Sequence, residues 1–237
     1  MNDCSVCIPA YNESQVIITK LRSELEAMGA EVVIVDDGSD IPLEGAIKHG
    51  SNFGYGSALM TAIKNATRDI VITIDGDGQH GAKEAKRLYE AWNLIPECDM
   101  LVGVRRIKGE KWHRLFGRKF LNWTASLICT FWLPDLNSGA RVIKRSVAIR
   151  YFPILCRTFS FTTSLTISLI CDGYKVEWFP IKVVERQQGK SHVNVVKHGL
   201  ITLYYILRNG LALRTRWIRN VLRRYRWWLV LTGKSNI

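Results

Sequence analysis

The sequence predicts a doubly wound α/β fold, in which a mainly parallel sheet carries helices on both faces. Three observations indicate this class. Short apolar runs alternate with helical patterns through the first half of the chain, three of those runs end directly in polar or acidic residues, and 237 residues with 47% hydrophobic content are enough for one sizeable core. Because ligands of such sheets bind at the carboxyl ends of the strands, these polar residues also predict where a site lies.

Four strands and three helices are expected in the first half. Apolar side chains recur at helical spacing between Val16 and Met28, with Asn12 or Ser14 available as the N-terminal cap. The apolar runs on either side are short, as strands are. The expected strands are Ser5–Ala10, Glu31–Val35, Asp69–Ile74 and Asp99–Val104, and the expected helices are Gln15–Met28, Ser57–Ala66 and Gly81–Leu94.

The second half of the chain is less regular. The expected elements are a helix over Trp112–Leu133, a short strand over Val142–Lys144 after a turn, a helix over Phe161–Cys171 and an extended segment over Lys175–Glu185. The many Thr residues of the second helix lower its helix propensity. Pro180 places the extended segment at a sheet edge or at a bend.

Cysteine usage argues against a disulfide-rich secreted protein, and hydropathy argues against a membrane-spanning one. The six cysteines form no disulfide framework, and Cys4-x-x-Cys7 has no second pair that would complete a zinc site. We therefore expect buried or half-buried free thiols and a reducing, cytoplasmic compartment. No apolar run reaches the roughly 18 to 20 residues that span a bilayer, so no transmembrane segment is predicted.

The net charge of +12 is concentrated towards the C-terminus. Residues from Arg186 onward hold eleven of the 33 Lys and Arg and no acid, whereas the preceding part is almost neutral. From Arg214 to Leu231, Trp and Leu recur at helical spacing with Arg largely on other faces, a pattern typical of a helix in a membrane interface. An anionic membrane surface is therefore the expected partner. The alternative is a helix packed on the body or on a membrane-protein partner, and nucleic acid is disfavoured because no nucleic-acid-binding module is present.

Asp75-Gly-Asp77-Gly-Gln79 is the sharpest local signal. Two carboxylates at i and i+2 past a buried strand are costly unless a cation neutralises them, and Mg²⁺ and Mn²⁺ prefer oxygen ligands. A calcium loop counted from Asp75 fails, because His80 and Lys86 stand where that loop needs Gly and Glu. A solvated turn that caps the following helix is the alternative.

Two further segments carry weaker signals. Asn52-Phe-Gly54-Tyr-Gly56 opens a helix, but a dinucleotide fingerprint fails there because Leu59 takes the position of the third glycine. Its glycines would let a ligand approach the backbone or would simply form a turn. Arg186–Ser191 is a basic loop that would either bind phosphate or lie in solvent.

Taken together, these segments resemble family 2 glycosyltransferases in their order and spacing. The matching segments are Val6–Glu13, Val35–Ser39, Asn52–Ala58 and Asp75–His80. Gly103–Arg105, Asp135–Arg141 and Val183–His192 are similar to the polyprenyl-phosphate branch, which includes dolichyl-phosphate mannose synthases. The resemblance covers about residues 4–192. The chain departs from the family pattern at Gly81, where Pro is common, and in Phe161–Ser164, which lacks a common Glu.

The resemblance implies a Rossmann-like A-type glycosyltransferase domain over residues 1–192, followed by a basic, amphipathic, membrane-associating tail over residues 193–237 with interfacial helices. It also implies which residues bind a nucleotide-sugar donor. Nucleotide contacts are implied for Pro9, Tyr11, Glu13 and Asp36, with Asp36 at the base, and the Mg²⁺ or Mn²⁺ ion on the diphosphate would be held by Asp75 and Asp77, with Gln79 nearby.

The same resemblance implies roles for three arginines. Arg105 and Arg114 would bind the phosphate of the acceptor, and Arg186 would close over the diphosphate of the donor. The implied reaction is transfer of a sugar, with inversion, to a polyprenyl (dolichyl or undecaprenyl) phosphate, by a protein held peripherally at the cytoplasmic face of a membrane. An acceptor phosphate is already ionised at neutral pH, so it needs positioning more than deprotonation.

Two other functions stay open at this point. One is a family 2 transferase acting on a sugar hydroxyl in polysaccharide or glycolipid assembly, with Asp135 or a neighbour as the base. The other is a non-catalytic nucleotide-sugar binder, which the intact Asp75, Asp77 and Arg186 disfavour.

Overall fold

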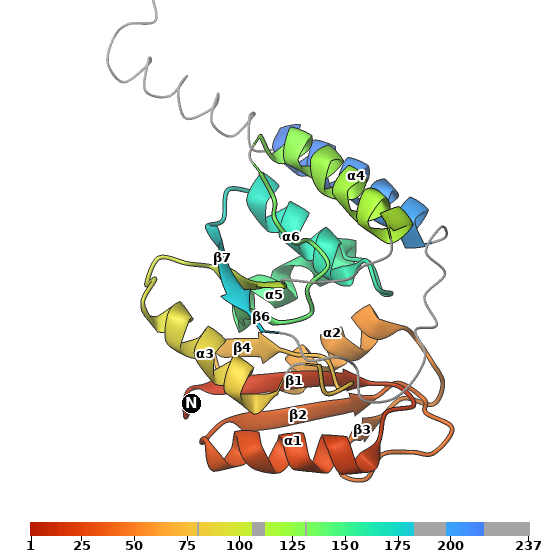
Figure 1. Ribbon diagram of the computed structural model, residues 1–237, viewed down its shortest axis with the longest axis vertical. Coiled ribbons are helices and arrows are strands. Elements are labelled where there is room, and N and C mark those ends of the chain that lie inside the picture. The colour runs from red at the N-terminus through yellow and green to blue at the C-terminus, as the bar shows by residue number, and fades with distance from the viewer. Residues whose placement is uncertain (80, 106–111, 131, 183–197, 216–237) are drawn as a thin grey trace, which may run out of the picture.

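A seven-stranded sheet with the order β3-β2-β1-β4-β6-β5-β7 forms the centre of the protein (Figure 1). The computed structural model describes residues 1–79, 81–105, 112–130, 132–182 and 198–215, with the backbone alone for 112–116 and 118. β6 runs antiparallel to both of its neighbours, and the other strand pairs are parallel. The strands are β1 (Cys4–Ala10), β2 (Glu31–Asp36), β3 (Ile47–Lys48), β4 (Ile70–Thr73), β5 (Met100–Arg105), β6 (Arg141–Lys144) and β7 (Val176–Ile181).

Helices cover both faces of the sheet, which confirms the predicted α/β class (Figure 1). They are α1 (Gln15–Ala27), α2 (Tyr55–Asn65), α3 (Ala82–Asn93), α4 (Trp112–Cys129), α5 (Arg145–Tyr151), the 3-10 turn η1 (Phe152–Ile154) and α6 (Phe161–Cys171), and residues 198–215 are also helical. One hydrophobic cluster packs α1 and α3 against the sheet, and the other packs α2, α4, α6 and residues 198–215. β1 contributes to both clusters because its side chains alternate between the faces, with Val6 and Ile8 in the first cluster and Cys7 in the second.

The structure corrects the expected pattern of elements in the second half. The helix expected over Trp112–Leu133 ends at Cys129, because Thr130 adopts a left-handed φ of 64° that a helix cannot continue through. The sheet is mainly parallel, as expected, and β6 is its antiparallel strand. β3 and α5 were not expected, since two and seven residues are too short to show a hydrophobic period.

Two expectations for the second half are confirmed. β7 lies at the edge of the sheet, where Pro180 removes no hydrogen bond from a further strand. α6 spans Phe161–Cys171 as expected, with every residue buried. Three of its hydroxyl groups are accommodated inside the core because they donate to carbonyls of the helix itself: Ser164 to Phe161, Thr166 to Thr162 and Ser168 to Ser164. The hydroxyl of Thr163 instead donates to Asn137 Oδ1 at 2.7 Å.

Residues 198–215 pack on the main body, although the sequence assigned them to a tail beginning at residue 193. Ile206 and Leu213 are buried in the same hydrophobic cluster as α4 and α6, and these helices lie together in Figure 1. Asn209 Nδ2 donates to the Ile154 carbonyl at 3.2 Å and to Ser168 Oγ at 3.1 Å. The helix expected over Arg214–Leu231 lies almost wholly outside the described residues.

Gly56 in α2 is expected to be intolerant of a side chain. A Cβ there would lie 2.4 Å from the Cys156 carbonyl oxygen, so the backbone before α6 would have to move. We expect Gly56→Ala to lower the free energy of unfolding by about 1–3 kcal/mol, the usual cost of overpacking, as measured by urea denaturation.

Gly117 provides the matched control, since it is also helical and a Cβ there would meet none of the described atoms within 4 Å. Gly117→Ala should leave stability unchanged or raise it by up to about 1 kcal/mol, because Ala has the higher helix propensity. Equal effects of the two substitutions would contradict the close packing of α2 against the segment before α6.

Candidate active site

The candidate site lies at the sheet edge where the carboxyl ends of β1, β2, β4 and β5 meet. β6 brings its amino end to the same edge because it is antiparallel: its first residue, Arg141, pairs with Thr73 of β4 and Val102 of β5. Thr73 Oγ1 donates to the Gly139 carbonyl at 2.6 Å, which fixes the turn before β6. The turn that contains Gly139 is therefore held beside the residues that follow β4.

Asp75 is held from two sides. Tyr55 Oη donates a hydrogen bond of 2.8 Å to Asp75 Oδ1. On another side the carboxylate packs against Gly139, where a Cβ would lie 2.3 Å from Oδ1. Gly139 therefore has no room for a side chain. Because glycine lacks one, this turn can approach the carboxylate closely. Burial, together with the neighbouring Asp75 carboxylate, raises the pKa of Tyr55 well above its ordinary value, so the phenol keeps the proton that it donates.

Asp77 follows on the same turn, as the sequence predicted. Its Oδ1 accepts the backbone N–H of Gln79 at 3.0 Å, and Gly78 takes a φ of 76° that suits glycine. Two carboxylates on one turn are a hard-oxygen donor set, which fits Mg²⁺ or Mn²⁺. Among the described residues no group of three or more His, Cys, Asp or Glu could hold a metal ion. Two carboxylates fill only part of the octahedral shell of Mg²⁺, and substrate phosphates commonly supply further oxygen ligands to this ion.

Arg141 is a fully buried cation beneath the site. Its Nε donates to the Ser138 carbonyl at 2.8 Å, its Nη2 to the Leu136 carbonyl at 2.7 Å, and its Nη1 to Thr166 Oγ1 at 2.6 Å. Burial lowers its pKa to about 10, which still leaves it protonated at neutral pH. Its bonds to two backbone carbonyls fold residues 136–138 into the turn that presents Gly139 to Asp75.

Arg105, at the end of β5, forms a two-pronged ion pair with Asp135. Nε lies 2.9 Å from Asp135 Oδ2 and Nη2 lies 3.0 Å from Oδ1. Burial alone would raise the pKa of Asp135. The hydrogen bonds from Arg105 and its charge nevertheless hold that pKa below its ordinary value. Burial likewise opposes the charge on Arg105, but the pairing with Asp135 raises the pKa of the guanidinium. The pair uses Nε and Nη2 of Arg105 and leaves Nη1 outside it.

Asp36 is the last residue of β2 and Asp37 follows it, and both are buried. Asp36 accepts three hydrogen bonds, from the N–H and hydroxyl of Ser39 and from the N–H of Leu43, so its observed role is to fix the turn after β2. Contact between this carboxylate and a nucleotide base stays a prediction. Asp37 binds the loop before α2, since it accepts the N–H groups of Phe53 and Gly54 and lies 2.6 Å from His49 Nδ1.

Pro9, Tyr11 and Glu13, which the sequence predicts to contact the nucleotide, lie at or just after the end of β1 at the same edge. Pro9 is buried near the end of β1, and its carbonyl lies so close to Gly76 that a Cβ there would be 3.0 Å away. Tyr11 is exposed and Glu13 is half-buried in the segment that follows β1. Asn12, between them, exchanges hydrogen bonds with Asp40, which ties this segment to the turn after β2.

Two predicted arginines cannot be placed with their side chains. Arg114 lies in α4, where only the backbone is described, and Arg186 lies outside the described residues. Three residues that contact the site were not selected from the sequence: Tyr55, Asp37 and Arg141. All three lie inside segments that had been singled out by pattern, but nothing in a linear pattern shows which member of a segment points inward.

The sequence matches the model of the family described as glycosyl transferase family 2 over residues 5–152. An undecaprenyl-phosphate 4-deoxy-4-formamido-L-arabinose transferase from Edwardsiella ictaluri is 29% identical, over 86% of this chain and 66% of that protein's length. An undecaprenyl-phosphate mannosyltransferase from Micrococcus luteus is 26% identical, over 87% of this chain and 98% of that protein.

The fold is similar to that of glucosyl-3-phosphoglycerate synthase from Mycobacterium tuberculosis, solved in complex with Mn²⁺, UDP and phosphoglyceric acid. The TM-score is 0.68 at 16% sequence identity, over 87% of this chain and 78% of that one. This likeness shows that the A-type glycosyltransferase fold expected from the sequence is present.

Removing one acceptor of the buried Arg141 should be costly. Thr166→Val keeps the shape of the side chain but leaves Arg141 Nη1 without its 2.6 Å partner. We expect the free energy of unfolding to fall by about 1–3 kcal/mol, the cost of leaving a buried donor unsatisfied, measured by chemical denaturation.

Thr124→Val is the matched control, because Thr124 also bonds to the carbonyl four residues before it but accepts nothing from Arg141. Its effect should stay within about 0.5 kcal/mol. If the two substitutions cost the same, the bond between Thr166 and Arg141 does not stabilise the fold.

Proposed function

This chain belongs to glycosyl transferase family 2, and on that premise we propose that it transfers a sugar from a nucleotide diphosphate-sugar to a polyprenyl phosphate with inversion. Relatives named for undecaprenyl-phosphate transfer support this acceptor, and they align with 86–87% of the chain. The first of them extends beyond the aligned part, which is 66% of its length.

The donor binds at the ends of β1, β2 and β4. Pro9, Tyr11, Glu13 and the turn fixed by Asp36 line the nucleotide pocket, and Asp75 and Asp77 hold Mg²⁺ or Mn²⁺ on the diphosphate with Gln79 beside them. The two carboxylates on one turn support this assignment, as does the Mn²⁺ named with the similar synthase structure. When bound, the ion neutralises negative charge on the departing diphosphate. Arg186, outside the described residues, is assigned the same task.

The state of Asp135 is the observation that carries the choice of acceptor. Many transferases that act on a sugar hydroxyl use a carboxylate to take the proton. Asp135 is buried, Arg105 occupies both of its oxygens, and its pKa is held low, so it is a poor base. An acceptor phosphate needs none. Its oxygen attacks C1 of the sugar as the bond from C1 to the donor diphosphate breaks, and the electron pair leaves with that diphosphate.

The acceptor phosphate binds on the β5 side of the site. Arg105 ends β5 with Nη1 outside its pair with Asp135, and α4, which contains Arg114, follows in the chain. Guanidinium groups bind phosphate oxygens by charge-assisted hydrogen bonds, so Arg105 and Arg114 are assigned to this role. They position the acceptor for attack on the sugar.

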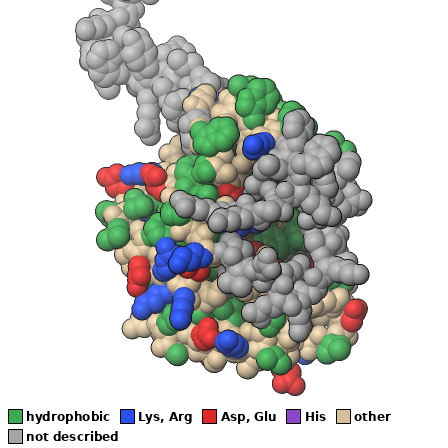
Figure 2. Space-filling view, viewed as in Figure 1, with side chains coloured by type: hydrophobic (Ala, Val, Ile, Leu, Met, Phe, Trp, Pro, Cys, Tyr) green, Lys and Arg blue, Asp and Glu red, His purple; other side chains and the backbone are tan. Residues whose placement is uncertain are grey.

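An anionic membrane surface at the cytoplasmic face is the proposed location. No helix among the described residues is long and apolar enough to cross a membrane. The outer face of α4 and residues 198–215 exposes large apolar side chains, and we call it the apolar face: Phe120, Trp123, Leu127, Leu200, Tyr204, Leu207 and Leu211, with Trp132 on the loop after α4. Hydrophobic side chains are visible at the upper part of the molecule, where Figure 1 shows α4 and residues 198–215 (Figure 2).

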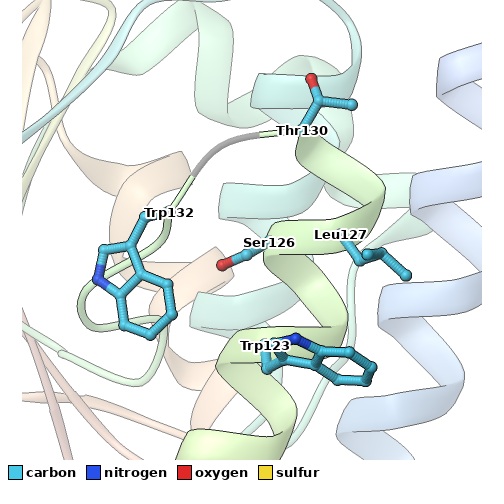
Figure 3. Close-up of a pocket in the computed structure, with 5 residues that line it drawn as sticks. All are labelled: Trp123, Ser126, Leu127, Thr130 and Trp132. Atoms are coloured by element: carbon cyan, nitrogen blue, oxygen red, sulfur yellow. The ribbon is translucent and has the colours of Figure 1, made fainter.

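The basic residues on these helices favour an anionic lipid surface as the binding partner of the apolar face. Neither α4 nor residues 198–215 contain an Asp or Glu, whereas they contain several Arg and Lys, and basic residues near an anionic leaflet each contribute about 1 kcal/mol. Trp123 and Leu127 on α4 and Trp132 on the following loop line a shallow groove of about 450 Å³ (Figure 3). Tryptophan is enriched at membrane interfaces, and the six buried free cysteines support a reducing compartment.

The function is tested by incubating the protein with a panel of nucleotide-sugars, Mg²⁺ or Mn²⁺, and either a polyprenyl phosphate or sugar acceptors, with mass spectrometry of the products. We expect a lipid phosphate that has gained one sugar. Asp77→Asn should abolish transfer with no change in thermal unfolding, because it removes one proposed metal-binding carboxylate.

Two outcomes would contradict the proposal. Transfer to sugar hydroxyls alone would favour the polysaccharide or glycolipid role. Full activity of Asp77→Asn in metal-stripped buffer would remove the metal from the mechanism.

Membrane binding should depend on the apolar face. We expect Trp123→Gln combined with Leu127→Gln to reduce sedimentation with phosphatidylglycerol-containing vesicles about tenfold or more, since each side chain contributes roughly 2 kcal/mol when buried. Ile41→Gln is the control, because Ile41 is equally apolar and 84% exposed but lies in the segment after β2. Unchanged sedimentation of the double variant would show that lipid does not dock on this face, and would favour residues 216–237 or a protein partner.

A further inference from the structure

Tyr55 links the candidate metal-binding turn to a part of the fold that is remote in sequence. It is the first residue of α2, and its hydroxyl reaches Asp75 Oδ1 at 2.8 Å. Its ring stacks on Phe159, with centroids 5.7 Å apart and an interplanar angle of 13°. The phenol is therefore oriented at both ends, by a ring partner and by a carboxylate.

The backbone around Tyr55 is fixed by close contacts. Asp37 accepts the N–H groups of Phe53 and Gly54, which sets the chain immediately before Tyr55. On the other side, Ser57 N–H donates to the Arg157 carbonyl at 2.9 Å. These bonds leave the start of α2 little freedom to move, so the Tyr55 hydroxyl has a defined position.

The aromatic contacts continue beyond Phe159. The Phe159 ring meets His198 edge-on at 5.2 Å, and Ser160 Oγ lies 2.7 Å from Thr202 Oγ1. The segment that orients Tyr55 is thus attached to residues 198–215, which form part of the apolar face. Phe159 is 47% exposed, and its ring contacts both Tyr55 and His198.

We infer that Tyr55 is a positioning residue that holds Asp75 in its metal-binding orientation, with Phe159 setting the direction of the phenol. The inference rests on the proposed function, because it assigns Asp75 to the metal. Asp75 has a short side chain whose oxygens can rotate about the last bond. The hydrogen bond to Oδ1 and the contact with Gly139 together select one orientation. Hydrogen bonds to metal-binding carboxylates commonly change metal affinity 10- to 100-fold.

The test is Mn²⁺ binding, measured by electron paramagnetic resonance with UDP or GDP present, on the full chain. Tyr55→Phe removes the hydroxyl and keeps the ring, and we expect it to weaken Mn²⁺ binding about tenfold or more. Phe159→Leu keeps the hydroxyl and removes the stacking partner, and we expect a smaller loss in the same direction. Thermal unfolding of each variant shows whether the fold is retained.

Tyr151→Phe is the matched control. Tyr151 also donates its hydroxyl to a carboxylate, that of Asp172, but this pair belongs to α5 and the end of α6. It should leave Mn²⁺ binding unchanged. If folded Tyr55→Phe binds Mn²⁺ as tightly as the parent, the positioning role is overturned while the proposed function stands. If the parent itself binds no Mn²⁺ with either nucleotide, the metal assignment fails and this inference fails with it.

Discussion

The buried guanidinium of Arg141 is the constraint on which the geometry of the site depends. A cation that is removed from water must be satisfied by the protein, and Arg141 is satisfied mainly by the carbonyls of Leu136 and Ser138 and by the hydroxyl of Thr166. Those bonds curl the chain before β6 into a tight turn and tie it to α6. Because β6 is antiparallel, this turn arrives at the edge where β4 ends.

The charges at this edge are arranged so that each has a partner inside the protein. Arg105 is paired with Asp135, Asp75 accepts from Tyr55, and Asp36 and Asp37 accept backbone N–H groups. Removing one member of a buried ion pair leaves the other charge without a partner. The resulting loss of stability exceeds the net stabilisation that the intact pair provides. In the proposed assignment, Asp75 and Asp77 offer oxygen ligands on the donor side, while Asp135 on the acceptor side stays paired with Arg105. That asymmetry suits transfer to an acceptor that is already ionised.

The proposed lipid-facing surface and the catalytic edge are connected through packed structure. α4 follows β5, whose last residue is Arg105, and α4 packs with α6 and residues 198–215 in one hydrophobic cluster. α6 in turn supplies Thr166 to Arg141. The proposed acceptor would keep its polyprenyl chain in lipid and its phosphate at the candidate site, and this hydrophobic cluster joins the elements that carry the two surfaces.

The sequence by itself determined the α/β class, most strands and helices of the first half, and the edge at which the site lies, because periodicity and strand-end acids are local properties of the chain. It identified Asp75 and Asp77 as a pair for the same reason. Only the tertiary structure decided that β6 is antiparallel, that Tyr55 and Arg141 support the site, and that Asp135 is paired with Arg105. It also decided that residues 198–215 belong to the packed body. These are contacts between residues from 20 to 74 positions apart, and a local pattern does not show which distant partner satisfies a buried charge.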